Sequence, residues 1–212
     1  MRELLLIAAV AATGCQHDVH SPFPPGLEPL EDNPIPPQTS GPYAETLMTK
    51  TEDGGFIHAY GRGYVDAPPG QVWAAMKTSQ AVVAVCTTDQ QTVTPKSDPR
   101  YELDFVVSYT VNNVVTVQWD DEWRFGTIDG TPDAPELAMV GHQKIDGSSF
   151  INRSEGTITV TPADGDDSVT DLAFVEHLDA IGDSDSDVLT GMNHDFGAIL
   201  ALTHGTAIPG CP

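Results

Sequence analysis

Alternation of apolar and polar residues along the chain predicts a domain built mainly of β-strands. Between residues 101 and 111 the odd positions are apolar or aromatic, and the alternation resumes over residues 114–125. This period of two is typical of strands with one buried face. Short turns separate five or six such segments, which predicts an antiparallel meander. The remaining alternating segments are residues 55–65, 136–144, 150–161 and 168–180.

Two segments have the helical period instead. Residues 69–80 begin with proline and place three apolar side chains on one face, so they predict a short helix. Residues 187–204 predict a longer helix, because Met192, Phe196 and Ile199 follow the spacing of an amphipathic face. The strands therefore lie between a short helix and a long C-terminal helix.

The N-terminus resembles a bacterial lipoprotein signal peptide, residues 1–14. The apolar run Leu4–Ala12 is too short for a bilayer, which needs about 20 residues, and has the size of a signal-peptide core. The motif Ala-Thr-Gly-Cys that follows resembles a lipobox, so cleavage would leave Cys15 as a lipid-modified first residue. Gln16 favours the outer membrane over the inner one. The alternative is an ordinary secretory signal with an incidental cysteine.

Eight prolines fall within residues 16–42. Proline fixes φ and removes a backbone donor, so this stretch should be extended and semi-rigid. We expect residues 15–42 to form a lipid-anchored linker, and residues 43–212 to form one domain held up to roughly 80 Å from the membrane. A disordered tail without a spacer role is the alternative.

Cys86 and Cys211 are the remaining cysteines. An even pair in an exported protein predicts a disulfide, which would stabilise the fold by up to about 4–5 kcal/mol on the chain-entropy model. The alternative is two free cysteines, one of them buried.

The chain carries 31 acidic against 9 basic side chains, a formal net charge of −22. Phosphates and anionic headgroups repel such a chain, so we expect no nucleic-acid partner and membrane contact only through the lipid anchor. Apolar residues make up 40% of the sequence, enough for a packed core. We expect a monomer.

Residues 65–76, Val-Asp-Ala-Pro-Pro-Gly-Gln-Val-Trp-Ala-Ala-Met, resemble the opening segment of the START/polyketide-cyclase (SRPBCC) superfamily. The resemblance covers about residues 55–205. It implies the α+β helix-grip fold, in which a curved antiparallel sheet grips a long C-terminal helix. It also implies a cavity between sheet and helix for a small hydrophobic molecule or lipid.

The alternation then nominates residues that face this cavity, although the same side chains could fill a solid core. The candidates are Tyr101, Leu103, Phe105, Val107, Tyr109, Trp119, Trp123, Phe125, Met192, Phe196 and Ile199.

Candidate chemistry is sparse. The seven histidines form no zinc motif, the aspartates before the last helix fail the EF-hand pattern, and no phosphate or dinucleotide fingerprint occurs, so we expect no metal and no cofactor. Glu176-His177-Asp179 and His194-Asp195 are the groups suited to acid–base work. Neighbouring strand residues point to opposite faces, so at most one of Glu176 and His177 can enter the cavity.

We therefore expect an exported, lipid-anchored protein of the bacterial envelope that binds or carries a small hydrophobic ligand, with no assigned catalytic residue. Two alternatives remain open. One is an enzyme of cyclase or aromatase type that uses a histidine or carboxylate in the pocket. The other is a non-catalytic envelope protein with a filled cavity, which acts through its surface.

Overall fold

The computed structural model describes residues 26–83, 86–112, 114–182 and 184–211. The predicted signal peptide and the predicted lipid anchor Cys15 lie outside these residues. Within the part of the chain that is described, no helix is long and apolar enough to cross a membrane.

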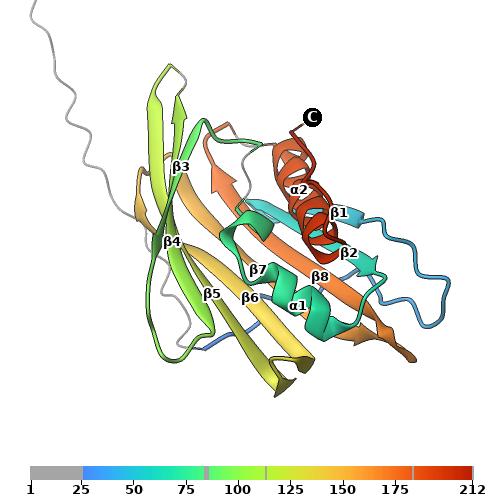
Figure 1. The fold of residues 1–212 in the computed structure, drawn as a ribbon. Coiled ribbons are helices and arrows are strands. Elements are labelled where there is room, and N and C mark those ends of the chain that lie inside the picture. The colour runs from blue at the N-terminus through green and yellow to red at the C-terminus, as the bar shows by residue number, and fades with distance from the viewer. Residues whose placement is uncertain (1–25, 84–85, 113, 183, 212) are drawn as a thin grey trace, which may run out of the picture.

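One antiparallel sheet of eight strands, in the order β1-β2-β8-β7-β6-β5-β4-β3, forms the body of the molecule (Figure 1). Neighbours in the sheet are also neighbours in the chain, except that β8 returns to pair with β2. The strands are β1 (Met48–Asp53), β2 (Ile57–Val65), β3 (Gln90–Pro95), β4 (Leu103–Asn112), β5 (Thr116–Thr131), β6 (Ala134–Gly147), β7 (Ile151–Ala163) and β8 (Asp166–Ala180).

Helices α1 (Pro69–Met76) and α2 (Asp185–Thr203) cover one face of the curved sheet, here called the inner face (Figure 1). The predicted α+β helix-grip class is confirmed. α1 ends four residues earlier than predicted, and a short 3-10 turn, η1 (Ser79–Ala81), follows it.

The six predicted strands correspond to β2 and β4–β8, whereas β1 and β3 were missed. Both are edge strands, and their residues are almost all exposed on both faces. A strand without a buried face has no alternation for a pattern to detect.

α2 lies close to β2 because two glycines leave room for it. A side chain at Gly61 would overlap Met192, and one at Gly63 would overlap the ring of Phe196. Trp73 of α1 is fully buried against the same face of the sheet, with its ring centroid 6.1 Å from that of Phe125. The core therefore lies between the two helices and the inner face.

The expected linker differs most from the structure. Residues 26–42, here called the N-terminal strap, lie against the outer face of the sheet. The Asn33 side chain donates to the carbonyl oxygens of Gly61 and Phe174, at 2.8 and 3.0 Å, and the backbone N–H of Gln38 donates to the Tyr64 hydroxyl at 2.6 Å. The folded unit thus includes residues of the strap and does not begin only at residue 43.

The prolines of the strap explain both the expectation and the error. Extended, proline-rich backbone offers few donors, so it cannot join a sheet as a strand, but its side chains can still pack. Leu27 does so where Gly126 and Gly141 leave the outer face bare. A spacer role for residues 26–42 is therefore wrong.

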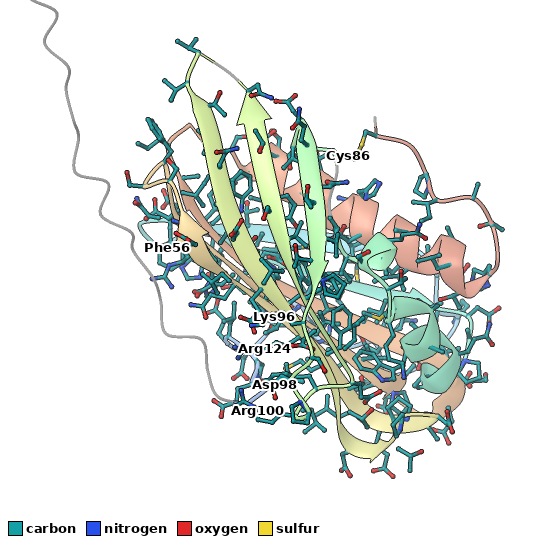
Figure 2. The ribbon with its side chains drawn as sticks, turned by 60° about the vertical axis from the view of Figure 1, so that its left-hand side comes forward. Phe56, Cys86, Lys96, Asp98, Arg100 and Arg124 are labelled. Carbon is teal, nitrogen blue, oxygen red and sulfur yellow. A yellow bond between two sulfur atoms is a disulfide. The ribbon has the colours of Figure 1, made fainter. Side chains whose placement is uncertain are left out.

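Cys86 and Cys211 form the predicted disulfide, with Cα atoms 5.2 Å apart. Cys86 lies beyond η1, and the bond joins this region to the tail that follows α2 (Figure 2).

Candidate functional site

A cavity of about 440 Å³ lies between the N-terminal half of α2 and the inner face of strands β4–β8. From the helix it is lined by Val188, Gly191, Met192 and Asp195. Ile181, which is 72% exposed, stands at its rim. The interior is therefore not solid beneath the start of α2, and this cavity argues against the alternative in which side chains fill the whole interior.

Aromatic rings form the wall of the cavity on the sheet side. The rings of Tyr109 and Trp119 stack with centroids 5.0 Å apart. Trp123 stacks on the imidazole of His142 at 4.2 Å. These paired strands thus present flat apolar surfaces to whatever enters.

Polar groups gather at one place in this apolar wall. His142 Nε2 lies 2.8 Å from an oxygen of Glu176, and both lie above Gly156, where a side chain would overlap them. Asp121 accepts hydrogen bonds from the Ser154 hydroxyl at 2.9 Å and from the indole N–H of Trp119 at 3.3 Å. The glycine on β7 therefore makes room for an ion pair that bridges β6 and β8.

Several buried atoms of this group have no hydrogen-bond partner among the described residues. With the indole nitrogen of Trp123, they are Oδ1 of Asp121, Nδ1 of His142 and Oδ1 of Asp195. The last lies 3.7 Å from Nδ1 of His194, beyond hydrogen-bond distance. Buried polar atoms in native proteins are nearly always satisfied by protein, water or ligand. Four such atoms around one cavity indicate a place where a polar group of a ligand would bind.

The surroundings of the cavity raise the pKa values of three of its side chains. Burial raises the pKa of Asp121 to about 6, against the lowering effect of His142. Burial likewise raises the pKa of Asp195 to about 7. Burial alone would lower the pKa of His142, but the surrounding carboxylates, Glu176 foremost, raise it to about 9.

The structure divides the eleven predicted lining residues into three groups. Tyr109, Trp119, Trp123 and Met192 line the cavity. Leu103, Phe105, Val107, Phe125, Phe196 and Ile199 face inward but lie in the packed core. Alternation identifies the inner face, but it does not show that Trp73 and Met76 of α1 fill half of the space above it.

Tyr101 is the candidate that the structure places elsewhere. It precedes β4, and its ring lies 5.4 Å from the guanidinium carbon of Arg100 and 5.1 Å from that of Arg124. Figure 2 labels both arginines, together with Asp98. The apolar alternation began two residues before the strand, so the assignment of Tyr101 to the cavity is wrong.

The opposite orientation of Glu176 and His177 is confirmed. Glu176 pairs with His142 inside the cavity, whereas the imidazole of His177 contacts Glu31 of the strap on the outer face. His194 lies near the Cys86–Cys211 bond. Asp121 and His142 were missed, although each has the parity of the buried residues of its strand. Charged residues on a buried parity were the signal that would have found them.

Solved structures share this fold at low sequence identity. A fragment of a STAR-related lipid transfer protein from Xanthomonas axonopodis has a TM-score of 0.50 at 16% identity, over 76% of this chain and 94% of that one. The lipid transfer and protein localization domain of human StarD13 has a TM-score of 0.48 at 13% identity, over 77% and 85% of the two chains. For the Zhui aromatase/cyclase from Streptomyces the values are 0.45 and 12%, over 70% and 91%. No protein-family model and no curated protein matches the sequence.

Proposed function

We propose that this START-like helix-grip protein is a binding protein that takes a small hydrophobic molecule into the cavity beneath α2. The cavity carries the proposal: about 440 Å³ lies within the range of small-molecule sites, and its lining combines apolar walls with a few buried polar groups. Lipid transfer in the Xanthomonas protein, which has the same fold, is consistent with a ligand of this class.

The lining also suggests the shape and polarity of the ligand. Stacked rings at Tyr109–Trp119 and Trp123–His142 favour a flat or unsaturated apolar body. The partnerless oxygens of Asp121 and Asp195 favour one head group that donates hydrogen bonds, such as a hydroxyl or an amine. We therefore expect an apolar ligand with a single polar end.

Native mass spectrometry of the gently extracted protein tests for a co-purifying ligand, and a hydrophobic dye tests the cavity itself. Val188→Trp should narrow the cavity, whereas Asn193→Trp adds the same side chain at an exposed position of the same helix. We expect V188W to weaken binding of N-phenyl-1-naphthylamine at least tenfold and N193W to leave it unchanged. Equal affinity in all three proteins, together with no bound ligand, would contradict the proposal.

A second function, acid–base catalysis on the bound molecule, is favoured by one observation. Two cavity carboxyls, Asp121 and Asp195, have pKa values of about 6 and 7, near the pH at which a proton donor or acceptor works best. Incubation of the protein with its co-purified ligand separates the two functions. A product that accumulates with the wild type and not with D121N or D195N indicates catalysis, whereas unchanged ligand indicates binding alone.

We further propose that the protein is exported and anchored in the bacterial envelope through Cys15, with the outer membrane favoured. The support is the apolar run that ends at the lipobox-like motif, and the disulfide, which is typical of oxidising compartments.

A further inference from the structure

Two histidines and a carboxylate meet outside the cavity, where the strap crosses the outer face of the sheet. Glu31 of the strap, His58 of β2 and His177 of β8 each offer one donor atom, and these atoms lie within 4.8 Å of one another. Oε1 of Glu31 lies 3.0 Å from Nδ1 of His58 and 2.9 Å from Nε2 of His177. The β2–β8 pairing sets the two histidines directly opposite each other.

A second layer of residues orients this group. Nδ1 of His177 lies 3.1 Å from Glu155, which Arg153 contacts at 2.6 Å. The Tyr60 hydroxyl donates to Glu31 at 2.7 Å. A carboxylate on the far nitrogen of a histidine fixes its tautomer and is the usual second shell of a metal-binding imidazole. Nε2 of His177 is then the nitrogen that presents a lone pair to the centre of the cluster.

The hydrogen bonds of the cluster converge on a single oxygen atom, where a cation could take the place of two protons. Tyr60, His58 and His177 all share Oε1 of Glu31. His177 also faces a carboxylate with each ring nitrogen, so both nitrogens would have to carry protons. A cation at the centre replaces the protons on Nδ1 of His58 and Nε2 of His177, and leaves the Nδ1 proton of His177 for Glu155.

We propose that Glu31, His58 and His177 bind a divalent transition metal of the zinc class, which fastens the strap to the sheet. Two imidazoles and one carboxylate are a donor set that zinc favours over the oxygen-seeking calcium and magnesium. Ligands about 2.1 Å from a tetrahedral zinc lie roughly 3.4 Å from one another, so the donor atoms are already close to the required spacing. The Glu31 side chain is 34% exposed, which leaves a path for the ion and a position for water as fourth ligand.

This site was not expected from the sequence, because its ligands are far apart in the chain and follow no local motif. Phe56, labelled in Figure 2, marks its position, since its ring stacks on His58 with centroids 4.3 Å apart.

Titration of the chelator-treated, full-length protein with ZnCl₂ by calorimetry tests the proposal. We expect one zinc per chain, with affinity lowered at least 100-fold in H58Q and H177Q and about 10- to 100-fold in the second-layer variant E155Q. Zinc should also slow hydrogen exchange in residues 26–42. His204→Gln is the matched control, because His204 also contacts a carboxylate, Glu45, at 2.7 Å, but lies outside the cluster. H204Q should bind zinc as the wild type does.

Two further variants keep the test decisive. The double variant H17Q/H20Q removes two histidines that lie close together in the sequence and could bind zinc on their own. Loss of zinc uptake in H17Q/H20Q but not in H58Q would overturn the proposal, as would no uptake by the wild type. If H177Q fails to fold, E31Q decides the matter, because its amide oxygen can still accept the Tyr60 hydrogen bond while the anionic ligand is removed.

Discussion

Burial of the Asp195 carboxyl lowers the stability of the folded protein. This residue lies on α2, lines the cavity and has a buried oxygen with no hydrogen-bond partner among the described residues. A carboxyl in such a place favours its neutral form, because the lost hydration of the charge outweighs the stabilisation that His194 and His142 supply. Stability has been given up at this position, which is typical of residues that serve a ligand.

The substitution Asp195→Asn should therefore stabilise the protein at high pH. The folded-state pKa of Asp195 is raised to about 7, so the native state binds more protons than the unfolded state between about pH 4 and 7. Wild-type stability should fall as the pH rises through that window, and D195N should lack this part of the loss. At pH 8 we expect D195N to gain on the order of 2 kcal/mol in urea unfolding. Curves that run parallel from pH 4 to 8 would show that Asp195 titrates normally.

The strap is the element that changes the picture of the fold. It has no regular secondary structure, yet it contacts β2, β8 and the glycines of β5 and β6. Its proline content predicted a segment without helix or strand, and the strap has neither, but such a segment can be solvated or packed. The strap packs on the sheet because the tyrosines and histidines of the outer face bind it, and because glycines there leave room for its side chains.

Asn33→Ala tests whether the strap belongs to the cooperative unit. The Asn33 side chain donates to two sheet carbonyls and accepts from the backbone N–H of Ile35 at 2.8 Å. Its loss should cost about 1–2 kcal/mol in urea unfolding and speed hydrogen exchange across residues 26–42. The exposed neighbour Asp32→Ala is the control and should change neither quantity. Identical behaviour of both variants would mean that the strap does not pack on the sheet.

At the scale of the whole molecule, the packed strap shortens the connection to the proposed anchor. Ten residues, 16–25, separate Cys15 from the described part of the strap, and ten residues reach at most about 35 Å. The domain would then be held much closer to the membrane than a spacer of residues 15–42 would allow. Such a position suits a protein that collects hydrophobic molecules near a bilayer.

Cys15→Ala should release the protein from the membrane. Without the thiol no lipid can be attached, and one apolar anchor is the sole membrane contact that we propose. In phase separation with a detergent, the wild type should enter the detergent phase and C15A the aqueous phase. If C15A stays in the detergent phase, or if the wild type does not enter it, the protein is not anchored through this residue.

The sequence by itself predicted a domain of antiparallel strands and two helices, the inner face of the sheet and the disulfide. These depend on local patterns: alternation, helical period and an even pair of cysteines. The helix-grip arrangement came from the resemblance of residues 65–76 to the START/polyketide-cyclase superfamily. Charged residues on a buried parity, such as Asp121 and His142, carried a further local signal of the polar group in the cavity.

Tertiary structure alone decided what fills the inner face and what covers the outer one. α1 fills one part of the inner face and leaves a cavity in the other, because α1, with its buried Trp73 and Met76, packs on β6, β7 and β8, and none of its residues lines the cavity. The meeting of Glu31, His58 and His177 depends on strand register and on the path of the strap. No spacing along the chain encodes these contacts, since they arise from packing between residues that are distant in sequence.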